Sequence, residues 1–404
     1  MGDLNSQLAL VPERLKNIMQ FQFVGCKHDG KLIAGYGASL KLNELLRPYG
    51  GGKILFVVDK VFIDNGVVEF LGKSLKNENI GYDLFYDIPP EPHIDSFRKC
   101  QDMVRGSKYS AIVGMGGGSV MDIAKAAAVC ATNSLDILEY CQGAVLACAG
   151  LPCILLPTTS GTGSEVSPYL VTSHENKKLF FGSPYMIATI AVVDPLLTVS
   201  MPPRVTAGTG LDALAHAVEG YIGTQNPLTE IFTAKSIEYV MRYLKRACLD
   251  GKDYEARYYM AFAAVYGMLS YSQGGGLYAH SLSYILTLDK NLEHGAGCGL
   301  GLPYTIMFNL NAAAAKQTLD DMARYTGLGS AKEMAEAFFR LVKEINMPSS
   351  LKELGVSLEQ VDPYAEILFR DYYRKKNPRP MSLEESRLLM RSMWDGELRE
   401  IPTV

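Results

Sequence analysis

The stretch Ala111-Ile112-Val113-Gly114-Met115-Gly116-Gly117-Gly118-Ser119-Val120 decides the fold. Three apolar residues typical of a buried strand run into a glycine-rich turn, and a helical pattern begins near Val120. Such a turn leaves backbone N–H groups at the positive end of a helix dipole, where a phosphate can bind closely because no Cβ intervenes. It differs from the G-x-G-x-x-G fingerprint, because its sixth residue is Ser119. A tight turn that needs positive φ explains the same glycines.

Asp59 favours the phosphate-binding interpretation. It follows the apolar run Ile54–Val58, and an acidic residue at the carboxyl end of a strand binds the ribose diol of NAD and repels the 2′-phosphate of NADP. In the usual dinucleotide fold this acid comes about 20 residues after the glycines. Here it precedes them. The sequence therefore predicts a variant of that fold.

Short apolar runs alternate with helical patterns in the first half of the chain. The predicted strands are Ile54–Val58, Leu84–Tyr86, Ala111–Val113, Cys153–Leu156 and Ile190–Val193, and the helical patterns include Val67–Leu75 and Met121–Val129. This alternation predicts a mainly parallel sheet with helices on both faces.

The second half has a different pattern. From Pro202 onward no strand is expected, and long segments such as Ile231–Tyr243 and Met322–Val342 have the apolar spacing of helices. We therefore predict an α/β dinucleotide-binding domain, a Rossmann-like variant, at residues 1–199, and an all-helical domain at residues 200–404.

Composition excludes several classes of protein. The chain has 404 residues, a net charge of -4 and no basic block that could follow a phosphate backbone, so nucleic acid is not expected as a partner. Its longest uncharged stretch, Tyr140–Ser164, is interrupted by glycine and proline, so no membrane helix is expected. The eight cysteines are scattered without a C-x-x-C pair and are expected to pack as small hydrophobes. Together with the absence of a secretory signal, they favour the cytoplasm.

A second polar loop, Pro157-Thr158-Thr159-Ser160-Gly161-Thr162-Gly163-Ser164-Glu165, follows a predicted strand. Ligands bind open α/β sheets at the carboxyl ends of strands, where these hydroxyl groups can bond to phosphate, ribose or carboxamide. A hydroxyl-rich turn that caps a helix explains the loop as well.

Asp212 and His216 are four residues apart in a segment of helical period, which places both side chains on one helix face. His280 is predicted on another helix, and His294 follows 14 residues later, near a loop or helix start. One aspartate and three histidines suit Fe²⁺, Zn²⁺ or a similar divalent ion. Helical histidines are also common in cores, so the spacing leaves both interpretations open.

Four motifs in order resemble the iron-containing (group III) alcohol dehydrogenase family. They are Gly116–Lys125, Pro157–Val166, Asp212–Tyr221 and His294-Gly295, and Asn377-Pro378-Arg379-Pro380 is similar too. The resemblance implies a dehydrogenase with a dinucleotide-binding domain, a helical metal-binding domain and an active site in the cleft between them.

The resemblance also implies individual roles. The metal ligands would be Asp212, His216, His280 and His294, holding Fe²⁺ or, alternatively, Zn²⁺ or another divalent ion. NAD would contact Asp59, Gly116, Gly117, Gly118, Ser119, Asp122, Thr158, Thr159, Thr162 and Lys178. Lys177 is the alternative to Lys178.

One departure from the family concerns catalysis. Many members carry a histidine four residues after the third ligand, where this chain has Tyr284. Tyrosine, with an ordinary pKa of about 10, is a poorer base near neutrality than histidine at about 6.5. Either the proton route differs, through water or ribose hydroxyls, or Tyr284 shapes a different substrate pocket. Tyr284 is thus the one candidate catalytic residue.

These observations predict reversible, NAD-dependent hydride transfer to or from a small primary alcohol or aldehyde, with aldehydes bearing a sulfonate or phosphonate included. The alternatives are a lyase similar to dehydroquinate synthase, whose family matches the threonine loop and the Asp-x3-His motif less well, and a noncatalytic scaffold. Because family members are commonly dimers, a homodimer is expected.

Overall fold

The computed structural model describes residues 3–16, 18–22, 30–50, 52–175 and 177–404, so that Cys26 and His28 lie outside the described residues. The chain divides into two compact units. The first is Met1–Thr159 with Gly163–Ser200, and the second is Ser160–Thr162 with Met201–Val404.

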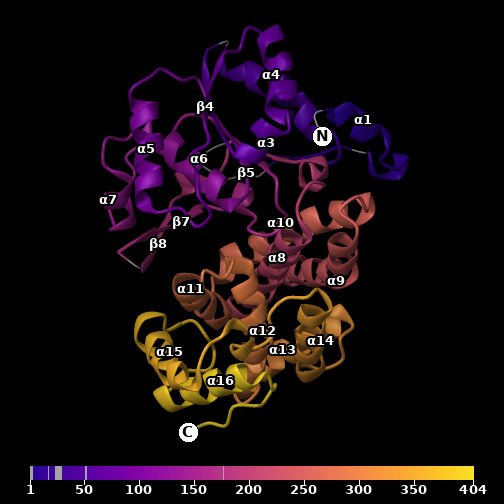
Figure 1. Cartoon of the computed structure of the whole chain (residues 1–404), viewed down its shortest axis with the longest axis vertical. Helices are drawn as coiled ribbons and strands as arrows, with labels where there is room; N and C mark the ends of the chain where they lie inside the picture. The colour runs from indigo at the N-terminus through magenta and orange to yellow at the C-terminus, as the bar shows by residue number, and fades with distance from the viewer. Residues whose placement is uncertain (1–2, 17, 23–29, 51, 176) are drawn as a thin grey trace. The chain divides into compact units, whose positions relative to one another are not determined.

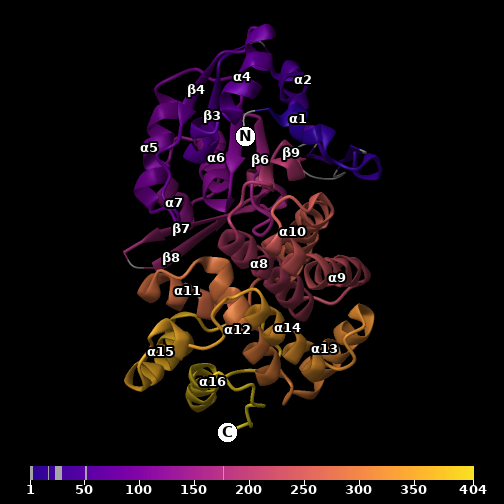
Figure 2. The same ribbon diagram turned by 45° about the vertical axis from the view of Figure 1, so that its right-hand side comes forward.

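The first unit is built on a seven-stranded sheet of order β1-β2-β9-β6-β5-β3-β4. Figures 1 and 2 show strands of this sheet, such as β4, together with the helices of the first unit. Its strands are β1 Met19–Gln22, β2 Lys31–Ala34, β3 Ile54–Val58, β4 Tyr82–Phe85, β5 Ile112–Gly116, β6 Cys153–Pro157 and β9 Ile190–Val193. Every neighbouring pair is parallel except β1 with β2. The predicted parallel sheet is confirmed, and the five predicted strands correspond to β3, β4, β5, β6 and β9.

The central strands are apolar without interruption because both of their faces are covered. All residues of β3, β5, β6 and β9 are buried, as expected for strands inside a parallel sheet. We did not predict β1, β2 or a separate antiparallel hairpin, β7 Tyr169–His174 and β8 Lys177–Gly182. Their sequences mix polar and apolar residues and lack long apolar runs.

The helices of the first unit are α1 Leu4–Ala9, α2 Leu42–Leu46, α3 Lys60–Asp64, α4 Val67–Asn77, α5 Ile94–Arg105, α6 Gly118–Cys130 and α7 Ile137–Cys141. Helix α6 packs against β3, β5 and β6. Its alanines at 124 and 126–128 are buried, and their small side chains let the helix lie close to the sheet. The glycine turn at its start is therefore held directly above the carboxyl end of β5.

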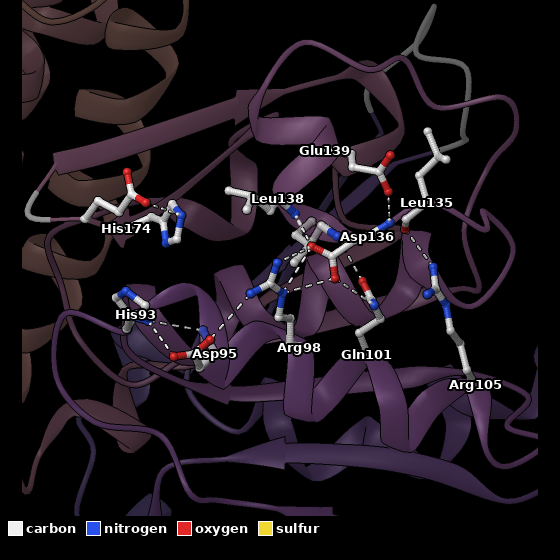
Figure 3. Close-up of polar contacts among 12 residues, drawn as sticks. His93, Asp95, Arg98, Gln101, Arg105, Leu135, Asp136, Leu138, Glu139 and His174 are labelled. Carbon is white, nitrogen blue, oxygen red and sulfur yellow. Dashed lines mark hydrogen bonds and ion pairs between the residues drawn. The ribbon is translucent and has the colours of Figure 1, made fainter.

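Asp136 joins α5 to α7 (Figure 3). Its carboxylate accepts hydrogen bonds from Arg98 at 3.1–3.2 Å and from the Leu138 N–H at 2.9 Å, and the Glu139 carboxylate accepts one from the Asp136 N–H. Although burial raises the pKa of Asp136, the bonds from Arg98 and Leu138 lower it below its ordinary value. This capping box starts α7 and serves the fold of the first unit.

The second unit is helical, and none of its described residues lies in a strand, as predicted. Its helices are α8 Pro203–Gly223, α9 Pro227–Leu249, α10 Tyr254–Gly274, α11 Tyr278–Lys290, α12 His294–Asn309, α13 Ala313–Thr326, α14 Ala331–Glu344, α15 Leu358–Asp371 and α16 Leu383–Asp395. Figure 2 shows α8 beside α10, with which it makes extensive contact.

One helical expectation is wrong in detail. The segment Met322–Val342 is not continuous, because it spans the end of α13 and most of α14. Gly327 and Gly329 between them have φ of 73° and 75°, a region that favours glycine. Ser330 then caps α14 by accepting a hydrogen bond from the Glu333 N–H. The apolar period continues across the break because both helices pack on the same core.

Two expectations drawn from composition can be compared with the structure. No helix among the described residues is long and apolar enough to cross a membrane. The seven described cysteines form no disulfide with one another.

Candidate metal centre and cofactor loops

The four predicted metal ligands lie on three helices of the second unit. Asp212 and His216 are on α8, His280 is on α11, and His294 begins α12. The Asp212 Oδ1 atom lies 3.8 Å from the His216 Nε2 atom, 4.0 Å from that of His280 and 3.7 Å from that of His294. Donors that share an ion at about 2 Å each are separated by roughly 3–4 Å. The distances from Asp212 therefore fit a common cation, and the set of donors that all lie within 4.8 Å of one another is Asp212, His280, His294 and Cys298, without His216.

Two of these donor atoms lack ordinary partners. Asp212 and His280 are buried, yet Asp212 Oδ1 and His280 Nε2 have no hydrogen-bond partner among the described residues. Buried polar atoms are nearly always satisfied, so a cation between them accounts for both. Burial also lowers the pKa of His216 and of His280, which keeps each imidazole neutral and able to ligate.

Glu219 orients His280 from behind. Its Oε2 atom lies 2.6 Å from His280 Nδ1, and its carboxylate accepts hydrogen bonds from the N–H groups of Leu277 and Ala279. Burial raises the pKa of Glu219 to about 7. We did not predict this role, although a carboxylate behind a ligating histidine is a common arrangement and Glu219 lies on α8 three residues after His216.

A glycine contact brings α12 to α8. A Cβ on Gly295 would lie 2.1 Å from the Gly208 carbonyl oxygen and 2.8 Å from the Asp212 Cβ. Only glycine at position 295 permits this approach, and the approach carries the neighbouring His294 to Asp212. In the His294-Gly295 motif, the histidine is thus a predicted ligand, and the glycine allows the helix packing that brings it to Asp212.

Cys298 is buried in the hydrophobic core of the second unit, as expected of the cysteines, and its sulfur also lies beside the predicted ligands. The ligand atoms of Asp212, His280, His294 and Cys298 all lie within 4.8 Å of one another. The Cys298 sulfur is 3.6 Å from His294 Nε2, one helical turn along α12. The i,i+4 spacing from His294 was the available signal. A thiol here adds a softer donor to an otherwise nitrogen and oxygen set.

Tyr284, the candidate catalytic residue, lies beside this cluster. It follows His280 by one turn of α11, and its ring stacks on that of His294 with centroids 5.5 Å apart and an interplanar angle of 16°. Burial raises the pKa of Tyr284 well above its ordinary value. The phenol is therefore neutral near pH 7, where it can donate a hydrogen bond but cannot serve as a base.

In the first unit, the predicted cofactor residues meet at the carboxyl ends of three neighbouring strands. The Asp59 N–H, after β3, donates to the Met115 carbonyl of β5 at 3.1 Å. The Thr158 N–H, after β6, donates to the Gly116 carbonyl at 3.0 Å. Gly117 is the N-cap of α6 and has no side chain to bond the first N–H groups of the helix, which begins at Gly118. This is the geometry of an anion cradle.

The side chains of two further cofactor candidates, Asp122 and Lys178, form contacts with other residues of the first unit. The Asp122 carboxylate accepts hydrogen bonds from the Ser164 hydroxyl at 2.6 Å and the Val171 N–H at 2.9 Å, and it pairs with Lys125. It therefore holds the end of the threonine loop. Lys178 is buried and forms an ion pair with Glu91.

The remaining candidates lie in or beside the same loops. Ser119 follows Gly118 in α6, and Thr159 lies next to Gly117, where an added Cβ would be 3.5 Å from the Thr159 methyl group. Thr162 groups with the second unit, together with Ser160 and Gly161. His216 has a hydrogen bond with the Gly161 backbone, so this short segment reaches a predicted ligand.

Comparison with known proteins covers both halves of the chain. The family model described as "Iron-containing alcohol dehydrogenase" matches residues 29–195, and the model described as "Fe-containing alcohol dehydrogenase family, C-terminal" matches residues 206–394.

Individual relatives match over nearly their whole length. Long-chain-alcohol dehydrogenase 1 of Geobacillus thermodenitrificans (strain NG80-2) is 32% identical over 91% of this chain and 95% of its own. Choline dehydrogenase of Bacillus subtilis (strain 168) is 34% identical over 86% of this chain and 89% of its own. The crystal structure of sulfoacetaldehyde reductase from Bifidobacterium kashiwanohense in complex with NAD+ superposes with a TM-score of 0.84 at 29% identity, covering 92% of this chain and 98% of that one.

Proposed function

Because this chain belongs to the iron-containing alcohol dehydrogenase family, we propose that it transfers hydride reversibly between NAD and a small primary alcohol or aldehyde. Members of this family are oxidoreductases that use NAD and iron, so the predicted enzyme class and cofactors are confirmed at the level of the family. The lyase similar to dehydroquinate synthase and the noncatalytic scaffold are therefore dropped.

The observation that carries the proposal is the Asp212 carboxylate oxygen, which faces three imidazole nitrogens at 3.7–4.0 Å and has no hydrogen-bond partner among the described residues. Asp212, His216, His280 and His294 would hold the ion, and Glu219 would keep the His280 ring in the ligating orientation. A bound divalent ion supplies Lewis-acid polarisation of the alcohol or aldehyde oxygen.

The cofactor loops support NAD rather than NADP. Bound NAD supplies the hydride acceptor. The N–H groups at the start of α6 would bind its pyrophosphate, and the hydroxyl groups of Thr158, Thr159 and Thr162 would complete the site. Asp59 would accept hydrogen bonds from the ribose diol and repel a 2′-phosphate. Lys178, rather than the exposed Lys177, is held in a fixed position by Glu91.

Tyr284 has a limited part in this proposal. Because its phenol is neutral near pH 7, it would orient the substrate oxygen as a hydrogen-bond donor and pack against His294, which excludes water from one side of the ligand cluster. Proton exchange with solvent then uses water or ribose hydroxyls and does not pass through a protein base at position 284.

A direct assay tests the proposed function. The purified chain is stripped with a chelator, reloaded anaerobically with Fe²⁺ or Zn²⁺, and supplied with NADH and a panel of short aldehydes. We expect NADH oxidation only in the metal-loaded samples and much weaker activity with NADPH. Equal activity before and after stripping would contradict the metal assignment.

Location and assembly are further parts of the proposal. We expect a cytoplasmic homodimer, without a nucleic acid or membrane partner. Light scattering on the purified chain measures the assembly, and a monomer at working concentrations would contradict it.

A further inference from the structure

Arg374 places a cation beside the candidate metal centre. It lies between α15 and Asn377 and is only partly exposed. Its Nε atom donates a hydrogen bond to the Ser281 hydroxyl at 2.7 Å, and Ser281 is the residue next to His280. Its guanidinium is therefore anchored close to one predicted ligand.

Tyr284 connects Arg374 to a second ligand. The Arg374 Cζ atom lies 5.6 Å from the centroid of the Tyr284 ring, and that ring also neighbours the His294 ring, at 5.5 Å between centroids. Arg374 also forms a side-chain hydrogen bond with Tyr284. One tyrosine ring thus contacts both the guanidinium and the metal cluster.

Arg374 forms no ion pair within 4.0 Å with any carboxylate among the described residues, and the carboxylate that acts on it electrostatically is Glu219. Arg379, five residues later, shows the contrast. It is buried, pairs with Glu385 at 2.7 Å and donates to backbone carbonyl groups, which is a structural role. Removing an arginine side chain from water without such a partner costs free energy, and a bound anion would offset that cost.

The charges around the site add to this argument. With Cys298 as a neutral thiol outside the ligand set, a divalent ion and Arg374 carry more positive charge than the buried carboxylates Asp212 and Glu219 carry negative charge. A guanidinium offers several N–H groups in a planar fork that matches carboxylate, sulfonate and phosphonate oxygens. The surroundings of the ligand cluster therefore attract anions and repel cations.

We infer that Arg374 binds an anionic group on the substrate, so that the preferred substrate is a short aldehyde or alcohol with a carboxylate, sulfonate or phosphonate at its far end. This inference rests on the proposed function and narrows its substrate class. Arg374 is a substrate-binding residue here and takes no part in hydride transfer.

Three aldehydes of similar size and different charge test the inference. They are succinic semialdehyde, which is anionic, butanal, which is neutral, and betaine aldehyde, which is cationic. With the iron-loaded chain and NADH, we expect the highest kcat/KM for the anionic aldehyde and the lowest for the cationic one. Salt should raise the KM of the anionic aldehyde, because it screens the attraction.

The variant Arg374→Gln should lower the ratio of anionic to neutral kcat/KM by about 10–100-fold, mainly through KM, since it removes a charge-assisted hydrogen bond. Arg374→Lys keeps the charge but not the planar set of N–H groups, so its ratio of anionic to neutral kcat/KM should lie between those of the wild type and Arg374→Gln. Arg370→Gln is the matched control, because Arg370 is 71% exposed and pairs with Asp371. It should leave the ratio unchanged.

Two results would overturn this inference and leave the proposed function intact. One is a wild-type preference for butanal over succinic semialdehyde, and the other is an unchanged ratio in Arg374→Gln. If Arg374→Gln does not fold, inhibition of the wild-type chain decides, with 4-hydroxybutyrate expected to inhibit at lower concentration than 1-butanol and the reverse order overturning the inference. No turnover of any aldehyde by the iron-loaded chain would instead overturn the proposed function.

Discussion

Glu219 Oε2 lies 2.6 Å from His280 Nδ1, and the opposite nitrogen of the same ring lies 4.0 Å from Asp212 Oδ1. Glu219 and Asp212 are both on α8, whereas His280 is on α11. Two carboxylates of one helix therefore contact a histidine of another from its two sides. Glu219 fixes the orientation of the His280 ring, and Asp212 lies on the side of the ring whose nitrogen can bind a metal.

The Glu219 contact predicts a loss of metal affinity in Glu219→Gln. The variant keeps the size of the side chain but removes the carboxylate that orients His280, and such changes typically weaken metal binding about 10–100-fold. Competition with a chromophoric chelator measures the affinity. Glu238→Gln is the control, since Glu238 is a partly exposed residue of α9 paired with Lys235. Equal affinities in both variants would show that Glu219 does not support the ligand.

Burial of Glu165 predicts a dependence of stability on pH. Its pKa is raised from 4.5 to about 7, so the folded chain keeps a proton that the unfolded chain releases between these values. Its contribution to the free energy of unfolding is complete below pH 4.5 and is lost as the pH rises to 7. Glu165→Gln, which does not titrate, removes this loss.

The Glu165→Gln variant should therefore gain stability over the wild type as the pH rises, by on the order of 2–3 kcal/mol between mildly acidic and mildly alkaline buffer. Urea unfolding of both proteins without metal, at the two pH values, measures the difference. A difference that is the same in both buffers would contradict the buried, protonated state of Glu165.

Asp59 predicts the choice of cofactor. Asp59→Ser removes the charge that would repel a 2′-phosphate, so the ratio of kcat/KM for NADPH to that for NADH should rise by about 10-fold or more. Initial rates at fixed aldehyde measure this ratio. Asp64→Asn is the matched control, because Asp64 is an exposed acid in α3 paired with Lys60. If both variants shift the ratio equally, the effect comes from general charge and not from the site.

The neutral phenol of Tyr284 predicts a small effect of Tyr284→Phe. Loss of a general acid or base typically costs about 10²–10⁴-fold in rate, whereas loss of one neutral hydrogen bond costs about 10-fold or less. With butanal, kcat should fall by no more than about 10-fold, and the shape of the pH profile should not change. Tyr325→Phe, at an exposed site on α13, is the control. Disappearance of one limb of the profile in Tyr284→Phe alone would make Tyr284 a proton donor or acceptor.

Much of the first unit could be predicted from local pattern. The strands β3 and β9 are runs of consecutive buried apolar residues, and their bounds coincide with the predicted ones. Asp59 and the glycine turn follow strands that turn out to be neighbours in the sheet. The β7–β8 hairpin was missed because its alternation is weak and its charged residues, such as Lys178, are not typical of strands.

In the second unit, the pattern predicts which face of a helix a residue occupies but not which helix that face meets. The spacing of Asp212 and His216 placed them together, whereas His280 and His294 were tied to them only by family resemblance. Glu219 and Cys298 become part of the centre through the packing of α8, α11 and α12, which depends on contacts such as that between Gly295 and Gly208. Arg374 is 94 residues from His280 in the chain, beyond the reach of any local period.

The central claim is that Asp212 and three histidines hold a catalytic metal, and His280→Ala tests it most directly. Iron content by elemental analysis and NADH turnover with butanal are measured on the wild type, His280→Ala and the control His93→Ala, whose side chain is 47% exposed in the first unit. We predict stoichiometric iron and turnover in the wild type and in His93→Ala, and loss of both in His280→Ala. Full iron content and full turnover in His280→Ala would contradict the account.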